Sequence, residues 1–109
     1  MNVTEKILKI YQDCKGREPF SEWIGTLTVR DRARVLARLD RVETGNIGDC
    51  RSVGEDVHEL RFHFGSGYRV YYGETDNTLV LLCGGDKASQ KKDVKKAETY
   101  WRDYIRRTI

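Results

Sequence analysis

Basic side chains lie on both sides of the turn Gly65-Ser66-Gly67, at positions that alternate with apolar residues. Side chains at alternate positions of a strand point to the same face of a sheet. A hairpin across this turn therefore brings Arg61 and His63 to the same face as Arg69. Tyr71 joins them by the same two-residue spacing. The sequence predicts a tight cluster of two arginines, one histidine and one tyrosine.

A cluster of this composition suits a phosphodiester. Arginine binds phosphate oxygens in a planar fork, and histidine can move a proton. RNA carries its own nucleophile, the 2′-hydroxyl, so an enzyme need only orient it, stabilise the phosphorane and protonate the leaving 5′ oxygen. Lys87 follows the next predicted strand closely enough to reach the same place. The alternative interpretation is that Arg61 and Arg69 are ordinary solvent-facing residues of a half-exposed sheet.

The register of this hairpin can be counted from the turn. A slip by one residue would turn Arg69 into the core, so the pattern constrains the pairing, and we expect Arg69 to lie off the core. The expected pairs are Phe64 with Tyr68, Phe62 with Val70 and Leu60 with Tyr72 on one face, and His63 with Arg69 and Arg61 with Tyr71 on the other.

The spacing of apolar residues predicts the elements that must hold this hairpin. In chain order they are a strand (4–11), two helices (20–27 and 29–42), three strands (57–64, 68–72 and 78–83) and a helix that begins at Ser89. We expect an α+β fold of order β-α-α-β-β-β-α, with a curved antiparallel sheet, an N-terminal helical hairpin and a C-terminal helix. Residues 1–109 are expected to form one domain.

Apolar stripes indicate which residues form the core. The second helix, with Thr28 as its N-cap, is expected to bury Val29, Ala33, Leu36, Leu39 and Val42. The strand over 78–83 is apolar on both faces and is expected inside the sheet, with Cys83 as a buried thiol. The expected core residues are Trp23, Leu36, Phe62, Val70, Leu81 and Trp101.

Composition excludes several classes of protein. The 109 residues contain no apolar stretch of about 18 residues that could span a bilayer, and the first residues lack the apolar block of a secretory signal. Three scattered cysteines and two histidines exclude a structural zinc site. We expect a cytoplasmic protein without metal or cofactor. Residues 86–107 hold eight Lys or Arg against four Asp or Glu, a pattern that attracts polyanions or acidic partners.

Three motifs carry a resemblance to a known family. They are Glu-Leu-Arg (59–61), Gly-x-Gly-Tyr-Arg (65–69) and Gly-Gly-Asp-Lys-x-x-Gln (84–90). With the segments around them they resemble the phage-derived addiction-module killer proteins, which are HigB-like toxins of the RelE/ParE superfamily. The resemblance extends from about residue 19 to residue 104 and implies a RelE-like fold.

The resemblance implies the toxin of a type II toxin–antitoxin pair. RelE-like and HigB-like members cleave mRNA on the translating ribosome, so it implies a metal-independent endoribonuclease. Carried over by motif, Arg61, Arg69 and Lys87 are expected to line the RNA site. We expect Arg69 to stabilise the phosphorane while Arg61 and Lys87 hold the phosphate. We add His63 as a candidate for proton transfer. The further residues expected to contact the substrate are Tyr68, Tyr71 and Gln90.

One departure from the family leaves the acid and the base open. RelE-type enzymes often place a C-terminal tyrosine near the scissile phosphate, whereas Tyr100 and Tyr104 lie within the predicted last helix. The expected partners are the ribosome, mRNA and a cognate antitoxin with a helix-turn-helix domain. Two other functions stay open: a ParE-like inhibitor of DNA gyrase without nuclease activity, and an inactive binding module.

Overall fold

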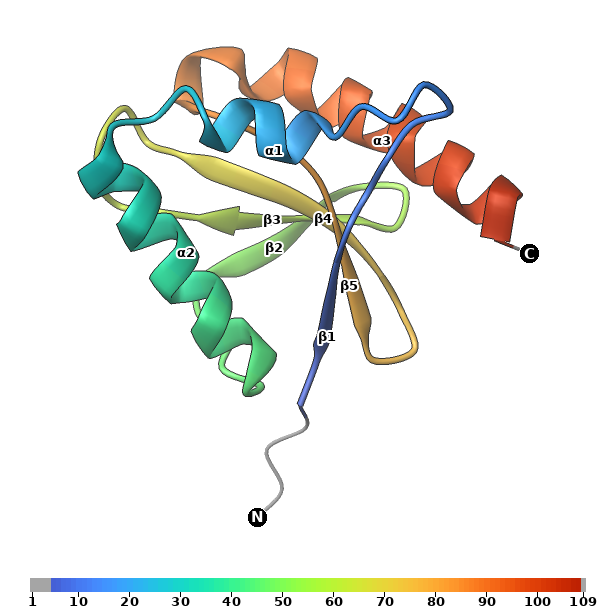
Figure 1. The fold of residues 1–109 in the computed structure, drawn as a ribbon, viewed down its shortest axis with the longest axis horizontal. Coiled ribbons are helices and arrows are strands. Elements are labelled where there is room, and N and C mark those ends of the chain that lie inside the picture. Colours follow the sequence, from blue (N-terminus) through green and yellow to red (C-terminus); the bar gives the residue numbers. More distant parts are fainter. Residues whose placement is uncertain (1–4, 109) are drawn as a thin grey trace.

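Five strands and four helical segments make up the part of the chain that the computed structural model describes, residues 5–108 (Figure 1). In order they are β1 (Ile7–Ile10), α1 (Pro19–Ile24), α2 (Val29–Glu43), β2 (Cys50–Gly54), β3 (Val57–Arg61), β4 (Arg69–Thr75), β5 (Thr78–Gly85), the 3-10 helix η1 (Lys87–Ser89) and α3 (Gln90–Thr108). The predicted α+β class is confirmed.

The sheet has the order β1-β5-β4-β3-β2, with β1 parallel to β5 and the other pairs antiparallel. The predicted position of β5 inside the sheet is confirmed. The predicted sheet was wrong in two respects, because it lacked β2 and was antiparallel throughout. β2 is an edge strand with mostly exposed side chains, so it shows no alternation of apolar residues. It joins β3 through a turn in which Asp56 has φ +58°, a left-handed conformation that aspartate tolerates.

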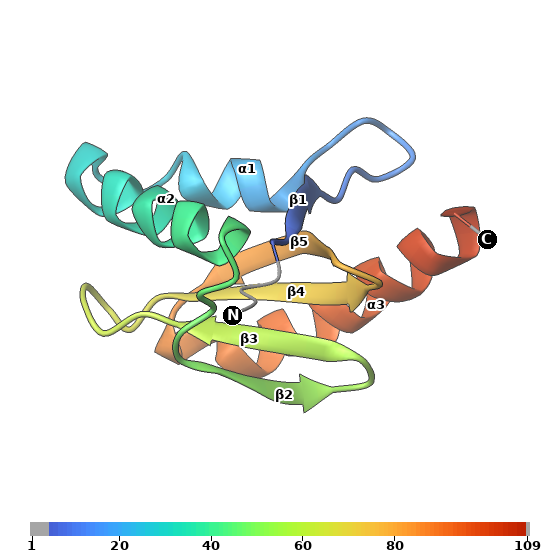
Figure 2. The same ribbon diagram turned by 90° about the horizontal axis from the view of Figure 1, so that it is seen from below.

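Helices cover both faces of the sheet (Figure 2). α1 and α2 lie on one face and diverge at a wide angle, so each contacts the sheet and the predicted helical hairpin is wrong (Figure 1). α3 lies on the other face, which holds Cys83 as the predicted buried thiol, and burial raises its pKa to about 12. No helix within residues 5–108 is long and apolar enough to cross a bilayer.

Two apolar cores result, one on each face of the sheet. The core under α1 and α2 contains Phe20, Val35, Leu39, Val42, Leu60, Phe62, Val70, Tyr72, Leu79 and Leu81. The core under α3 contains Tyr11, Val57, Tyr71, Val80, Leu82, Cys83, Ala97 and Trp101. The face of β3 and β4 that the alternative interpretation left half-exposed is therefore largely covered by α3.

The inward face of α2 differs from the predicted stripe. Thr28 caps the helix as predicted, since its hydroxyl accepts a hydrogen bond from the Asp31 N–H at 3.1 Å. Val29 and Leu36 are 78% and 44% exposed, so their place in the predicted core is wrong. Val35, Leu39 and Val42 form one row on the helix and are buried against the sheet. Val29 and Leu36 belong to the adjacent row, which is turned toward solvent because only one row can face the sheet.

We expect Leu39→Ala to lower the free energy of unfolding by about 2–5 kcal/mol, since it leaves a cavity beneath α2. Leu36→Ala removes the same atoms from an exposed site and should change stability by less than about 0.5 kcal/mol. Urea unfolding of both variants checks this. Equal losses would contradict the orientation of α2.

The C-terminal half of α3 is tied to the segment that follows β1. The Tyr11 hydroxyl donates a hydrogen bond to Asp103 Oδ2 at 2.6 Å, and Arg107 Nη2 lies 2.8 Å from the same oxygen. These hydrogen bonds lower the pKa of Asp103 to about 2. Burial, together with the neighbouring carboxylate, raises the pKa of Tyr11 to about 12.

This tie predicts a loss of stability in acid. The pKa of an aspartate in an unfolded chain is about 3.9, so the lower folded-state pKa of Asp103 stabilises the protein above that value. The contribution is lost as the pH falls through about 2. We expect Asp103→Asn to show a smaller fall in Tm than the wild type between about pH 5 and pH 2. Parallel Tm curves in circular dichroism would contradict this.

Candidate functional site

The loop between β3 and β4 is fastened to the rest of the molecule at two places. The Tyr68 hydroxyl donates a hydrogen bond to Asp31 Oδ2 on α2 at 2.8 Å. On the other side, the Ser66 hydroxyl donates to Asp86 Oδ2 at 3.1 Å, and the Lys87 N–H donates to the Ser66 carbonyl at 3.3 Å. These contacts bring the start of η1, and with it Lys87, next to the hairpin.

A hollow of about 380 Å³ opens at this end of the molecule. It is lined by Arg61, Phe62, His63, Phe64, Gly65, Gly67, Arg69 and Lys87. The four predicted catalytic side chains are all among these residues. Gly67 has φ +78°, and a Cβ on it would lie 3.3 Å from Lys87 Cβ and 3.4 Å from Arg69 Nη1. Because glycine has no Cβ, the side chains of Lys87 and Arg69 can both approach the loop at Gly67.

β3 and β4 pair two residues away from the predicted register. Arg61 lies opposite Arg69 rather than opposite Tyr71. The reason is the loop: the Phe62 N–H donates to the Tyr68 carbonyl at 3.0 Å, so five residues (63–67) connect the strands in place of the expected three. Within this loop the Gly67 N–H donates to the Phe64 carbonyl at 3.3 Å. A shift by an even number of residues preserves the faces, so Arg61 and Arg69 still share one. Two cations directly opposite repel each other unless anions lie beside them.

Asp49 supplies one of these anions. Its Oδ1 accepts a hydrogen bond from Arg61 Nη2 at 3.2 Å, and its Oδ2 lies 2.7 Å from His63 Nε2. The hydrogen bonds with His63 and Arg61 lower the pKa of Asp49, which keeps the carboxylate charged. The side chain of His63 is 76% exposed. The imidazole is therefore oriented by a carboxylate and open to a ligand, as a proton-transfer group must be.

Glu59 supplies the second anion, and it is completely buried. Its Oε1 lies 3.1 Å from Arg69 Nε and accepts from Gln90 Nε2 at 2.9 Å, while its Oε2 accepts from Arg51 Nε at 3.0 Å. Arg69 Nη1 also donates to the Gly67 carbonyl at 2.8 Å. A buried carboxylate is tolerated only with such partners. Glu59 thus fixes the guanidinium of Arg69 beside the hollow.

The environment of Arg69 corrects the prediction that this residue lies off the core. Its side chain is on the predicted face of β4, but α3 covers that face and leaves only 12% of the side chain exposed. Sequence reasoning identified the cations and missed Asp49 and Glu59. Glu59 alternates in phase with Arg61, which was a usable signal, whereas Asp49 precedes a strand that the pattern did not reveal.

The three predicted substrate contacts do not line the hollow. Tyr71 is completely buried under α3, and burial raises its pKa above the ordinary value. Gln90 donates to buried Glu59. Tyr68 lies on the opposite face of the sheet, where its ring packs edge-on against Trp23 at a centroid distance of 5.9 Å. In the described structure these three residues pack in the core or hold neighbouring side chains, and none of them faces the hollow.

Residues 22–102 match the family described as Phage derived protein Gp49-like (DUF891), a range that contains all four basic residues of the hollow. An uncharacterized protein of Haemophilus influenzae is 46% identical to this chain over 81 residues. The aligned residues cover 72% of this chain and 82% of that protein. The chain therefore belongs to the phage-derived Gp49-like family, which is a RelE/toxin-like family.

Proposed function

We propose that this protein is the toxin of a type II toxin–antitoxin pair and that it cleaves mRNA on the translating ribosome. One observation carries the proposal. Four basic side chains from three segments of the chain converge on one hollow, and three of them are oriented by acidic residues. Membership of a RelE/toxin-like family supports it.

The arrangement accounts for each requirement of RNA cleavage. Lys87 and Arg61 hold the non-bridging oxygens of the scissile phosphate, and Arg69 stabilises the additional charge of the phosphorane. The 2′-hydroxyl loses its proton as its oxygen bonds to phosphorus. The bond from phosphorus to the 5′ oxygen then breaks, and that oxygen gains a proton. The products are a 2′,3′-cyclic phosphate and a 5′-hydroxyl. We assign the proton transfer to His63, because its ring lines the hollow and contacts Asp49.

A basic hollow of this kind must be kept from RNA in the cell that makes it. We assign that task to a cognate antitoxin, a small protein with a helix-turn-helix domain encoded beside the toxin. It would cover the hollow with acidic side chains or keep the toxin off the ribosome by its bulk. Co-purification of the neighbouring gene product with this chain tests the pairing.

The function is tested with purified translating ribosomes and the wild-type protein. Primer extension on the mRNA detects cleavage, and a DNA gyrase supercoiling assay runs in parallel. We expect mRNA cleavage and unchanged supercoiling. Intact mRNA together with blocked supercoiling would establish the gyrase inhibitor instead, and no effect in either assay would indicate an inactive binding module.

A further inference from the structure

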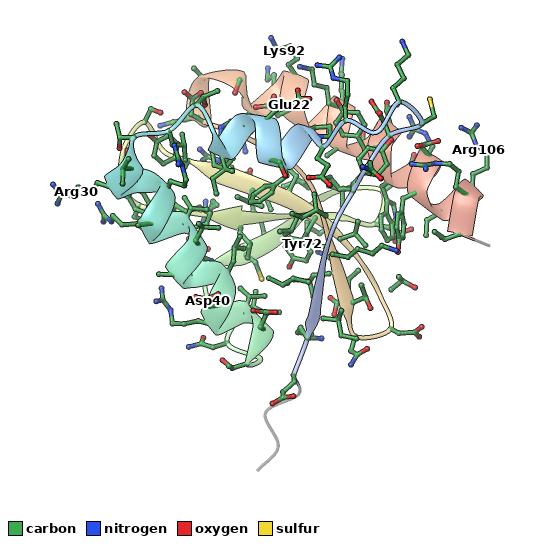
Figure 3. The ribbon with its side chains drawn as sticks, viewed as in Figure 1. Glu22, Arg30, Asp40, Tyr72, Lys92 and Arg106 are labelled. Carbon is green, nitrogen blue, oxygen red and sulfur yellow. The ribbon has the colours of Figure 1, made fainter. Side chains whose placement is uncertain are left out.

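A row of exposed lysines extends from the hollow along η1 and the first half of α3. We call it the lysine ridge; it consists of Lys87, Lys91, Lys92, Lys95 and Lys96. Figure 3 shows Lys92 projecting outward from α3, away from the sheet. None of the five forms an ion pair with another residue between positions 5 and 108.

The acidic residues of the same segment are turned away from the ridge. Asp86 caps η1, where its carboxylate accepts hydrogen bonds from the N–H groups of Ala88 and Ser89. Asp93 is buried and accepts a hydrogen bond from the Ser89 hydroxyl. Both carboxylates are therefore engaged in holding the start of α3. Glu98, the other acidic residue on this half of the helix, accepts a hydrogen bond from the Glu55 N–H at 3.4 Å and forms no ion pair with a ridge lysine among residues 5–108.

The second half of α3 shows the opposite pattern. Arg106 and Arg107 lie 2.9 and 2.8 Å from the carboxylate of Asp103, and Arg102 lies 3.9 Å from Glu55. One helix thus carries paired arginines at its C-terminal end and unpaired lysines at its N-terminal end. Basic composition alone does not explain this difference.

The position of the ridge is unfavourable for the helix itself. The N-terminal end of a helix dipole is positive and favours acidic side chains. Like charges four residues apart, such as Lys91 with Lys95 and Lys92 with Lys96, also repel. The ridge therefore destabilises α3, so the stability of the helix does not account for its presence.

We propose that the lysine ridge binds the phosphate backbone of RNA and guides the strand toward the hollow, an inference that rests on the proposed function. Lys87 belongs to both the ridge and the hollow, so the two surfaces are continuous. α3 rises about 8 Å from Lys91 to Lys96. Lysine side chains along this length can contact successive phosphates of one strand.

The ridge fits nucleic acid better than protein. Binding surfaces for proteins are centred on aromatic or large aliphatic anchors. The large hydrophobic residues that the described structure exposes are Ile7, Ile10, Val29 and Leu36, and none of them lies on η1 or α3. A polar and strongly positive surface without such an anchor is typical of contact with a nucleic acid backbone.

The test measures binding of a short 2′-O-methylated RNA, which lacks the nucleophile and stays intact. The ridge variant neutralises three lysines outside the hollow, Lys92→Gln, Lys95→Gln and Lys96→Gln. Each contact to single-stranded RNA contributes about 0.7 to the slope of log K against log salt. We expect the slope to fall by about 2 and the affinity at about 0.1 M salt to fall by about 100-fold.

The matched control neutralises three exposed cations away from the ridge that also lack ion-pair partners among residues 5–108: Lys15→Gln, Arg30→Gln and Arg41→Gln. We expect its salt slope to fall by less than about 0.7, the value of one contact. We also expect the Tm of the ridge variant to equal or exceed that of the wild type, since the substitution relieves repulsion at the helix start. Equal losses of RNA affinity in both variants would overturn the proposal.

Two further outcomes separate this inference from the proposed function. If the ridge variant binds RNA like the wild type but loses affinity for an acidic poly-glutamate peptide, the ridge is a protein-docking surface and the inference is wrong. If the wild-type protein binds RNA through the ridge yet cleaves no mRNA on ribosomes, the inference stands and the proposed function fails.

Discussion

Lys87→Ala is expected to slow mRNA cleavage on translating ribosomes by about 100- to 1,000-fold, the loss typical when a preorganised donor to a developing anion is removed. The side chain lines the hollow and is exposed, and it forms no ion pair within residues 5–108. Its contribution to stability should therefore be small. The backbone N–H that fastens η1 to the hairpin loop is unchanged in the variant.

The measurement is single-turnover cleavage, with circular dichroism to confirm folding. Lys15→Ala is the matched control, because Lys15 is also exposed and lies far along the chain from the hollow. We expect the control to cleave at the wild-type rate. If Lys87→Ala also cleaves at the wild-type rate, Lys87 has no role in cleavage.

Local patterns were sufficient to predict the elements around the hollow. The two-residue alternation on either side of Gly65-Ser66-Gly67 placed Arg61 and Arg69 on one face. That assignment survives a register error because the error is an even number of residues. The motif that ends β5 placed Lys87 nearby, and the structure brings it to the same hollow.

Long-range packing could not be predicted from the same patterns. Nothing in the alternation of β4 shows that α3 lies over Tyr71, so a residue expected at a surface is completely buried. Asp49 and Glu59 acquire their partners from β3, β4 and α3, which are distant in sequence. Leu36 was misplaced for a related reason, since α2 carries two apolar rows and only the sheet decides between them.

The burial of Glu59 makes Arg69 a residue with two separable contributions. Arg69→Ala removes the cation proposed to stabilise the phosphorane, and it also removes one of the cations paired with the buried carboxylate of Glu59. Breaking a buried ion pair from one side typically costs about 3–5 kcal/mol. Arg51 and Gln90 still donate to Glu59, so we expect a loss near the lower end, about 3 kcal/mol.

A double variant, Arg69→Ala with Glu59→Gln, separates stability from catalysis. Glutamine keeps the shape of Glu59 and removes its charge, so the buried negative charge that has lost Arg69 is no longer present. We expect the double variant to regain about 1–3 kcal/mol relative to Arg69→Ala, as a coupling energy between touching residues. Cleavage should stay as low as in Arg69→Ala, because the guanidinium is still missing from the hollow.

Two measurements on the same protein samples separate the contribution of Arg69 to stability from its contribution to cleavage. Urea unfolding gives the first, and the rate of mRNA cleavage on ribosomes, at a temperature where all variants are folded, gives the second. Arg51→Ala is the control, since it removes a different donor from Glu59 and lies outside the hollow. It should lower stability while leaving cleavage within a few-fold of the wild type. If the double variant recovers cleavage along with stability, Arg69 serves the fold alone and the phosphorane must be stabilised by Arg61 and Lys87. If Arg69→Ala is as stable as the wild type, Glu59 does not depend on Arg69, and the orientation of this guanidinium has another cause.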